Sequence, residues 1–542
     1  MPFETILTPE TAERFTREGY WRNRTITDFL DAAAAKDPDK LAVVDPRGRC
    51  TYGELKALVD RCALGLLELG IGPGDMVSFQ LPNWTEWIVV HYAASRIGAV
   101  SNPLIPIYRD REVGYMLRLA ASKLVVVPRE FRGYDHAEMV QRLRPGLPDL
   151  EHVMVVGEPL DQMSSWAEFI ETPWERRRDP AELPALRPHP DELTLLMFTS
   201  GTTGDPKGVM HTHNTLIAAN DPWPDRLGLD GDTVFHMAST FGHLTGFLYG
   251  ARLPTQLAAT GVYQDVWNAE RFVELVEEHG ITISSGATPF LSDTLGAANL
   301  ADHDVSSLRR YCCMGAPIPR VMLREAREKL PGVAVLGGWG QSENGLVTLG
   351  KPDDPEAKIT NTDGCPWPGM QIRVVDWEGA ELPAGTEGRL QVKGQTLFVG
   401  YANGIEMTRA SFDGDWFDTG DLAVIDADGY LSISGRTKDV IIRGGENIPV
   451  SYVENVLYEH PRIDTVALVA MPDPRLQERA CAVVVLTPGE LLTLDDVRRF
   501  LQEKGVAKPY WPERLEVVAD MPRTASGKIQ KFRLREQILG GS

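Results

Sequence analysis

The first half of the chain is a repeated succession of helix-like and strand-like segments, and this pattern limits the fold more than any other feature. Residues 51–70 are the clearest helix, with Thr51 as N-cap, Glu54 completing a capping box and Gly70 ending it. Later segments alternate in the same way: strand at 75–82, helix at 85–100, strand at 123–128, and a helix followed by a strand at 271–289 and again at 318–340. Such alternation predicts a layered α/β architecture with helices packed on sheets.

The pattern of residues along the sequence changes near Met370. From there to about residue 435, short alternating strands are separated by turns that contain Gly, Asp and Pro, which is typical of a β-rich unit. A smaller segment of mixed helices and strands follows. Because 542 residues are too many for one compact core, we expect two domains. They are an N-terminal domain at 1–435, with its β-rich subdomain at about 370–435, and a small α+β C-terminal domain at 436–542.

The charge and the cysteine content argue against several classes of function. With 55 basic against 76 acidic residues the net charge is -21, which disfavours sequence-independent nucleic-acid binding. Six cysteines without metal-type spacing indicate a reducing compartment and no structural zinc. The first residues lack the pattern of a secretory signal, and no apolar run approaches the roughly 20 residues of a membrane helix. We therefore expect a cytoplasmic protein without a membrane span.

The densest chemical signal is MFTSGTTGDPKGVMH at residues 197–211. A strand-like run leads into it, so residues 199–208 would form a loop that leaves a buried strand. Glycines allow close approach of the backbone, hydroxyls donate to phosphate oxygens, and Lys207 adds positive charge. The loop is not a P-loop of the G-x-x-x-x-G-K-[ST] type, because Pro206 precedes the lysine and Gly208 stands where a Mg²⁺-binding hydroxyl would be. The segment therefore predicts a phosphate site of another kind.

This loop resembles the signature loop of the adenylate-forming, or AMP-binding, enzymes, which include acyl-CoA synthetases, aryl-CoA ligases, luciferases and the adenylation domains of peptide synthetases. Five further blocks resemble motifs of that family and occur in the family's order. They are GAPIP (315–319), GWGQSE (338–343), WFDTGD (416–421), GRTKD (435–439) and RTASGKI (523–529). The resemblance extends over essentially the whole chain. It implies the family's fold, in which layered α/β subdomains and a β-rich subdomain form a large N-terminal region and a small α+β C-terminal domain is mobile.

The resemblance also implies an ATP site built from these blocks. Asp421 would accept hydrogen bonds from the ribose hydroxyls, and Arg436 would share the ribose or bind phosphate. The other nucleotide-binding residues would be Thr199, Ser200, Gly201, Thr203, Gly204 and Lys207 of the loop, Gly315, Ala316 and Pro317 of the adenine-pocket turn, and Gly338, Trp339, Gly340, Gln341 and Ser342.

Joining a carboxylate to the α-phosphate of ATP brings two negative groups together, so cationic and hydrogen-bonding groups must surround the point of transfer. By resemblance, Lys528 would bridge the carboxylate and the α-phosphate during adenylation. Glu343, helped by Thr202, would bind Mg²⁺, which normally accepts carboxylate and phosphate oxygens. His243 falls where relatives carry a histidine at the entrance of the acyl pocket, and we expect it to contribute to that pocket or to catalysis.

In the family's second half-reaction the small domain rotates about the residue two positions after the hinge arginine, which is Lys438 here. Gly444, Gly445 and Glu446 would then line the channel for the pantetheine arm of coenzyme A, because glycines suit the close approach of a narrow thiol. Nothing in the sequence resembles a carrier domain, so free coenzyme A is the expected acceptor. An adenylating enzyme that uses a carrier protein or oxygen, and a non-enzymatic nucleotide-binding protein, remain alternatives.

The expected reaction is ATP-dependent ligation to coenzyme A of a small-to-medium apolar carboxylic acid larger than acetate. Acetate-specific relatives place Trp directly before Gln-Thr-Glu, whereas this chain has Gly340 there, which predicts an open pocket floor. The candidate walls are mostly small or apolar: Ala238, Thr240, Phe241, Gly286, Cys313 and Met314. The sequence as a whole resembles ligases for cyclohexanecarboxylate and for short- to medium-chain fatty acids, so an alicyclic acid is one option. The sequence leaves open whether the protein forms a homo-oligomer.

Overall fold

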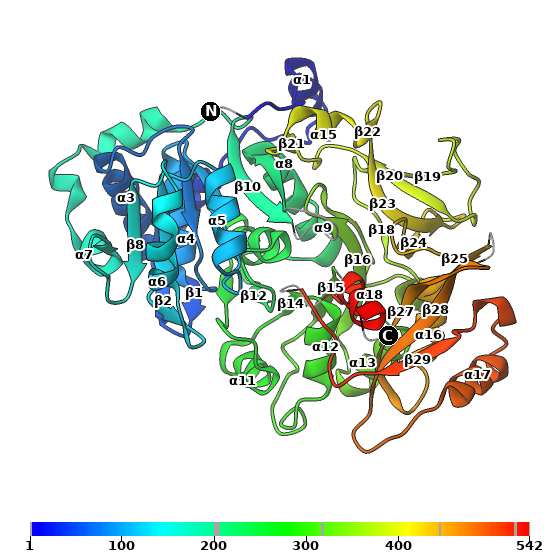
Figure 1. Cartoon of the computed structure of the whole chain (residues 1–542). Coiled ribbons are helices and arrows are strands. Elements are labelled where there is room, and N and C mark those ends of the chain that lie inside the picture. The colour runs from blue at the N-terminus through cyan, green and yellow to red at the C-terminus, as the bar shows by residue number, and fades with distance from the viewer. Residues whose placement is uncertain (1–2, 200–205, 316–318, 444–445, 525–527, 541–542) are drawn as a thin grey trace.

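The computed structural model describes residues 3–199, 206–315, 319–443, 446–524 and 528–540. Figure 1 shows most of the blue and cyan part of the chain at one end of the molecule and the orange part at the other, whereas the first helix, α1, and the last helix, α18, lie between these ends. No helix in the described ranges combines the length and the apolar character needed to cross a bilayer.

The first large sheet has eight strands within the described residues, in the order β21-β11-β10-β4-β3-β5-β8-β9. These strands are β3 (Met76–Phe79), β4 (Val100–Pro103), β5 (Leu124–Pro128), β8 (His152–Val156), β9 (Ser164–Ser165), β10 (Leu193–Thr199), β11 (Lys207–Thr212) and β21 (Gly400–Tyr401). The helices of this region are α3 (Tyr52–Glu68), α4 (Thr85–Arg96), α5 (Asp110–Leu119) and α6 (His136–Leu143). Strands β3, β4 and β5 pair in parallel and are buried along their whole length, as expected of a sheet covered on both faces.

The second large sheet has nine strands in the described part of the chain, in the order β18-β17-β16-β15-β14-β12-β13-β1-β2. These strands are β1 (Leu41–Asp45), β2 (Gly48–Thr51), β12 (Val234–Met237), β13 (Thr260–Val262), β14 (Ile283–Gly286), β15 (Arg310–Met314), β16 (Ala334–Gln341), β17 (Gly345–Leu349) and β18 (Cys365–Pro366). Its helices include α8 (His213–Asn220), α11 (Ala269–His279), α12 (Thr288–Leu295) and α13 (Arg320–Lys329). Each neighbouring pair from β16 through β15, β14, β12 and β13 to β1 is parallel. The edge strand β2 does not belong to this parallel set.

Parallel pairing decides where a site can form. In sheets of this kind, ligands bind beyond the carboxyl ends of the strands. Met314 ends β15 and Gln341 ends β16, so the GAPIP block and the last residues of the GWGQSE block leave the sheet at the same edge. The fold therefore brings together two motifs that are separate in the sequence.

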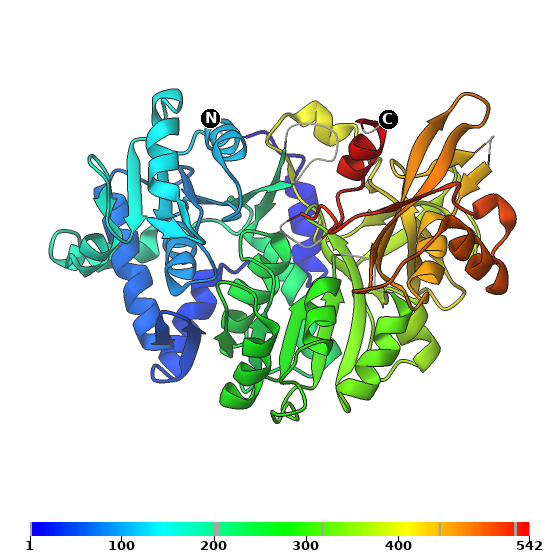
Figure 2. The same ribbon diagram turned by 60° about the horizontal axis from the view of Figure 1, so that its bottom comes forward.

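Two smaller five-stranded sheets follow, the third antiparallel and the fourth mixed, because β28 and β29 pair in parallel. The third sheet contains β19 (Gln371–Val375), β20 (Gly388–Lys393), β22 (Phe412–Asp413), β23 (Trp416–Ile425) and β24 (Leu431–Arg436). The fourth contains β25 (Ile441–Arg443), β26 (Glu446–Ile448), β27 (Ile463–Asp473), β28 (Gln477–Leu486) and β29 (Arg514–Val517), with helices α16 (Val450–Leu457), α17 (Leu494–Glu503) and α18 (Lys531–Gly540). Both views show α18 between the fourth sheet and the body of the molecule (Figures 1 and 2). The division at residues 435 and 436 stays a prediction, and it falls next to the end of the last strand of the third sheet.

Most of the elements expected from the sequence are present. The Thr51 side chain accepts from the backbone N–H of Glu54 at 3.3 Å, which confirms the predicted capping box of α3. Two expectations were wrong in detail. The segment 85–100 is helical only to Arg96, and Val100 begins β4, a strand that the run of apolar residues concealed. The predicted loop 199–208 is also too long, because Lys207 already begins β11.

The N-terminal segment lies against the residues that lead into β21. It contains α1 (Pro9–Arg17), and its backbone N–H at Ile6 donates to the carbonyl of Val399 at 2.9 Å. The indole of Trp21, only 4% exposed, donates to the carbonyl of Gln395 at 3.0 Å. Figure 1 shows α1 beside β21. Residues 3–21 therefore form a strap across the end of the first sheet.

Candidate active site

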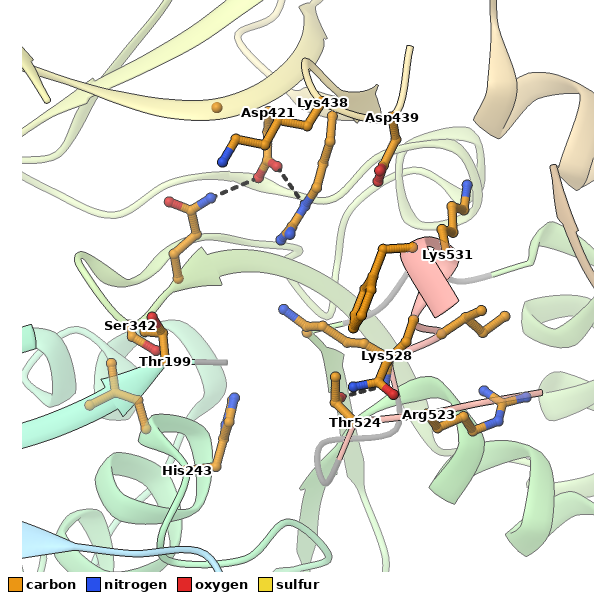
Figure 3. A pocket seen from close by; sticks show the side chains of 18 of the residues that line it. Thr199, His243, Ser342, Asp421, Lys438, Asp439, Arg523, Thr524, Lys528 and Lys531 are labelled. Carbon is orange, nitrogen blue, oxygen red and sulfur yellow. Dashed lines mark hydrogen bonds and ion pairs between the residues drawn. The ribbon is translucent and has the colours of Figure 1, made fainter. Parts of the chain in front are cut away.

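A large cleft lies where the two large sheets, the third sheet and the C-terminal segment meet (Figure 3). Its volume is about 2590 Å³, well above the roughly 300–1,000 Å³ of a site for one drug-sized ligand. The predicted site residues that line it are Thr199, Lys207, His243, Gly315, Gly338, Trp339, Gly340, Gln341, Ser342, Glu343, Asp421, Arg436, Lys438 and Lys528. The fold thus gathers residues of all six sequence blocks in one cleft with room for more than one ligand.

The remaining predicted site residues lie outside the described part of the chain. They are Ser200, Gly201, Thr202, Thr203, Gly204, Ala316, Pro317, Gly444 and Gly445. The backbone of Glu446 begins β26, but its side chain is not described. Their roles stay predictions.

The Asp421 carboxylate is held by three donors, one from β24 and two from β16. Strands β23 and β24 pair Asp421 directly with Arg436, and the guanidinium Nε lies 3.2 Å from Oδ1. The other oxygen, Oδ2, accepts from Trp339 Nε1 at 2.9 Å and from Gln341 Nε2 at 3.0 Å. Asp421 is only 4% exposed, whereas the Arg436 side chain is 43% exposed. Oδ1, whose partner is the exposed Arg436 side chain, is therefore the oxygen that a ligand hydroxyl could share.

Glu343 follows β16 and faces the cleft beside a tyrosine. Tyr401 donates its hydroxyl to Glu343 Oε1 at 2.8 Å, and burial together with the carboxylate raises the pKa of that phenol. The ammonium of Lys207 lies 4.7 Å from the centre of the same ring. The Tyr401 side chain thus contacts both a predicted metal ligand and a predicted phosphate ligand.

The donor set around Glu343 fits a magnesium ion bound mainly through substrate. Among the described residues, no cluster of three or more His, Cys, Asp and Glu side chains could form an all-protein metal cage. A single carboxylate that leaves the other positions to phosphate and water is the arrangement that Mg²⁺ normally accepts. Thr202, the second predicted ligand, lies outside the described residues.

Lys528 reaches the cleft from the C-terminal segment. The backbone N–H of Lys528 donates to Thr524 Oγ1 at 3.1 Å, and the backbone N–H of Thr524 donates to the carbonyl of Lys528 at 2.7 Å. A Cβ added at Gly315 would lie 3.9 Å from Cε of Lys528, so the lysine stem passes close to Gly315, the residue that follows β15. Burial and the nearby Arg436 lower the pKa of Lys528 to about 8, against the opposing effect of Asp421 and Glu343. At neutral pH the side chain is therefore still mostly a cation.

His243 lies on the opposite side of the cleft from Lys528 (Figure 3). Burial, with a smaller contribution from the charge of Lys528, lowers the pKa of His243 to about 3. Its Nδ1 accepts from the backbone N–H of Thr245 at 3.3 Å, which places the single proton of the neutral ring on Nε2. His243 can therefore donate a hydrogen bond into the cleft, but it is not a cation at neutral pH.

The predicted walls of the acyl pocket are only partly correct. Met314 lines the cleft, whereas Ala238, Thr240, Phe241, Gly286 and Cys313 do not. Side chains alternate along β15, so Cys313 packs in the buried cluster on the other face of the strand. The Phe241 ring is fully buried and packs edge-on against Trp87 at 5.2 Å. The apolar part of the lining comes instead from Met197, Leu244, Tyr249, Gly345 and Leu346.

The role expected for Gly340 also needs correction. Its backbone lines the cleft, but a Cβ there would lie 1.9 Å from the carbonyl oxygen of Gly345. The cause is a register shift between Trp339 and Gly340 that presses β16 against β17. The lack of a side chain at Gly340 is therefore required by strand packing, and a tryptophan there could not simply fill the acyl pocket.

Three site residues escaped the sequence analysis. Tyr401 reaches Glu343 across the fold, Tyr249 lines the apolar part of the cleft, and Asn344 Oδ1 accepts from the backbone N–H of Gln341 at 2.7 Å. Asn344 could have been noticed, because it directly follows the GQSE block. The two tyrosines carry no local signal, since only the tertiary fold brings them to the site.

Comparison with known protein families matches both parts of the chain. Residues 30–402 match the AMP-binding enzyme family, and residues 452–528 match the AMP-binding enzyme C-terminal domain. The N-terminal strap precedes the matched region.

Full-length relatives and solved structures agree with this match. The chain is 38% identical to a medium-chain fatty-acid–CoA ligase of Escherichia coli K12, over 97% of this chain and 92% of the relative. It is 32% identical to a salicylyl-CoA synthase / salicylate adenylyltransferase of a Streptomyces species, over 98% and 97%. The crystal structure of the anthranilate CoA ligase AuaEII in complex with anthranoyl-AMP superposes with a TM-score of 0.88 at 26% identity, over 96% of this chain and 98% of that one. The chain therefore belongs to the AMP-binding, adenylate-forming enzymes, among which it is an AMP-forming acid–CoA ligase.

Proposed function

We propose that this ligase activates a medium-chain fatty acid in the cleft described above. The observation that carries the proposal is the meeting, in one cleft, of an apolar wall, a partly buried lysine and a firmly held carboxylate. Met197, Leu244 and Leu346 belong to that wall, while Lys528 and Asp421 line the polar part. The relative from Escherichia coli is a medium-chain fatty-acid–CoA ligase, which supports the same class of substrate here.

In the first half-reaction, a carboxylate oxygen of the acid attacks the α-phosphorus of ATP. The new carbon–oxygen–phosphorus link forms as the bond to the β-phosphate breaks, and pyrophosphate leaves. We assign Lys528 the role of bridging the two anionic groups, because a cation held in a buried site opposes their repulsion more strongly than one in water. His243, neutral with its proton on Nε2, would orient the carboxylate from the other side.

The nucleotide would be held by groups from separate segments. Asp421 would accept from the ribose through Oδ1, and Thr199 and Lys207 would contact phosphate at the start and end of the signature loop. Glu343 would hold Mg²⁺, which when bound neutralises phosphate charge and favours departure of pyrophosphate. Tyr401 would keep that carboxylate in position.

In the second half-reaction, the sulfur of coenzyme A attacks the acyl carbonyl, and the bond to AMP breaks. The segment 443–447, which contains Gly444, Gly445 and Glu446, would line the thiol channel after a rotation about Lys438. In the present arrangement Lys528 lines the cleft and Arg443 does not, because its guanidinium donates to the Pro509 carbonyl at 2.7 Å and pairs with Glu513. This arrangement supports an assignment to the adenylation step.

Pyrophosphate release and thioester mass, measured across a panel of acids with and without coenzyme A, test the proposal. The panel runs from acetate through octanoate to palmitate and includes cyclohexanecarboxylate and salicylate. We expect medium-chain acids to release pyrophosphate without coenzyme A and to turn over to acyl-CoA with it. Turnover that requires a carrier protein or oxygen would contradict the proposed acceptor, and preference for salicylate would contradict the proposed acid.

The cellular location is also a proposal. All six cysteines are free thiols, and five of them are buried. Unpaired thiols suit a reducing compartment, which supports the cytoplasm. Fractionation of expressing cells tests this directly, and recovery with the periplasmic or membrane fraction would contradict it.

A further inference from the structure

Tyr249 belongs to η4 (Gly246–Arg252), a π-helical segment that follows the acyl-pocket histidine in the chain. Its ring lines the apolar part of the cleft, and the residue is only 3% exposed. The backbone N–H of Leu346 donates to its hydroxyl at 2.8 Å. This bond ties the far end of the side chain to β17, whose residues Gly345 and Leu346 also line the cleft.

Aromatic rings fill the space behind Tyr249. Its ring lies 4.4 Å from that of Trp223, with an interplanar angle of 31°. Trp223 lies in turn 6.1 Å from Trp367, and neither tryptophan is more than 1% exposed. The tyrosine ring therefore has no space into which it could withdraw when a longer ligand enters.

The backbone that carries Tyr249 is equally confined. A Cβ added at Gly246 would lie 2.1 Å from the carbonyl oxygen of Thr240, and one added at Gly250 would lie 2.8 Å from Met237 Cγ. The helix thus lies directly on its neighbours at both of its glycines. Because interiors packed this closely do not yield easily, the position of the ring is fixed by the fold.

From these contacts we infer that the ring of Tyr249 is the blind end of the acyl pocket and sets the greatest chain length that the ligase accepts. The inference rests on the proposed function and assigns a residue to its substrate limit. His243 and Tyr249 are six residues apart in the chain, and both line the cleft, so the ring lies near the residue expected at the entrance of the acyl pocket. A closed end this near the entrance would suit a chain of several methylenes better than a long one.

The direct test replaces the ring and measures kcat/KM for saturated acids from butyrate to palmitate. In Tyr249→Ala and Tyr249→Leu the pocket should lengthen toward Trp223. Each methylene that becomes buried should raise kcat/KM roughly fourfold, so the preferred acid should become longer by two or more carbons. Tyr249→Trp should shift the preference toward shorter acids. Both Tyr249→Ala and Tyr249→Leu open the pocket, so the test still stands if one of these variants does not fold.

Two control variants separate length selection from general loosening. Tyr249→Phe keeps the ring and removes only the hydroxyl that accepts from Leu346, so the order of preference among acids should stay as in the wild type. Tyr263→Phe removes a hydroxyl that donates to the carbonyl of Gly250 at 2.7 Å from outside the cleft. It disturbs the same helix and should also leave the order of preference unchanged.

The outcomes distinguish this inference from the proposed function. If the wild-type enzyme forms acyl-CoA from medium-chain acids, but both ring-removing variants fold, bind ATP and keep the wild-type order of preference, Tyr249 is not the limit. A change in preference that Tyr263→Phe reproduces would also overturn the assignment. If the wild-type enzyme accepts no straight-chain acid at all, the proposed substrate class fails first.

Discussion

The hydroxyl of Tyr401 donates to Oε1 of Glu343 at 2.8 Å, although the two residues are 58 positions apart in the chain. The same ring lies 4.7 Å from the ammonium of Lys207. One tyrosine thus contacts a carboxylate proposed to hold the metal and a lysine proposed to hold phosphate, and we propose that it positions both.

Replacing Tyr401 by Phe should weaken the dependence of adenylation on Mg²⁺ without abolishing adenylation. Loss of a hydrogen bond that orients a metal ligand typically costs 10- to 100-fold in metal affinity. We expect the Mg²⁺ concentration for half-maximal ATP–pyrophosphate exchange to rise roughly tenfold. Tyr401→Leu, which also removes the ring beneath Lys207, should in addition raise the KM for ATP. An unchanged Mg²⁺ titration in the Phe variant would rule out the positioning role.

Lys528→Ala should suppress acyl-adenylate formation by roughly two to three orders of magnitude. The physical reason is the loss of the cation between two anionic reactants. Thioester formation from supplied acyl-adenylate should be largely spared, because that step has no such repulsion to overcome. Lys508→Ala, an exposed lysine of the same region, is the matched control and should retain both steps. Equal loss of both half-reactions in Lys528→Ala would contradict the assignment.

The pH dependence of adenylation should have a basic limb that belongs to Lys528. Burial lowers its pKa to about 8, and only the protonated form can bridge the two anions. The value of kcat/KM, which reports the free enzyme, should therefore fall as pH rises through about 8, approaching tenfold per pH unit. His243, with a pKa of about 3, should add no limb near neutrality. A basic limb that persists unchanged in Lys528→Arg would argue against this origin.

Gly340→Ala should destabilise the fold instead of changing the choice of acid. Its Cβ would meet the Gly345 carbonyl oxygen at 1.9 Å, so β16 and β17 would have to separate. Overpacking of this kind typically costs 1–3 kcal/mol or more, and thermal unfolding should detect it. Gly350→Ala is the control, because its Cβ would find only ordinary contacts from 3.6 Å outward. Equal melting temperatures for wild type and Gly340→Ala would mean that the strands yield easily.

Buried histidines should make the protein sensitive to mild acid. Burial lowers the pKa of His211 to about 4 and those of His213 and His236 to about 3, whereas the unfolded chain titrates near 6.5. Between these values the unfolded state binds more protons, so the free energy of unfolding falls as pH decreases from about 6.5 toward 4. Each group contributes up to about 1.4 kcal/mol per pH unit.

The melting temperature should therefore drop between about pH 7 and pH 5, before most carboxylates titrate. His236→Phe removes one titrating group that packs 4.5 Å from Phe272, and its melting temperature should depend less steeply on pH than that of the wild type. Equal slopes for the two proteins over this range would show that His236 does not contribute.

The sequence predicted the periodic elements, and the meeting of the six blocks in one cleft, better than it predicted the shape of the pocket. Periodicity and capping residues act locally, which is why the helix from Tyr52 and its Thr51 cap were correctly expected. The walls of the acyl pocket depend on which face of β15 each side chain takes and on where the helix after β12 lies. Neither is encoded in a short window, so Cys313 was assigned to the pocket and Tyr249 was overlooked.

The strap formed by residues 3–21 has a practical consequence for how the protein should be produced. The family match begins at residue 30, which invites a shortened version that starts there. Such a version would lose the N–H of Ile6 that bonds to Val399, two residues before Tyr401, and the indole of Trp21 that bonds to Gln395. A truncated enzyme that stays folded would thus loosen the support of Glu343, the proposed metal ligand, and its activity would understate that of the intact chain.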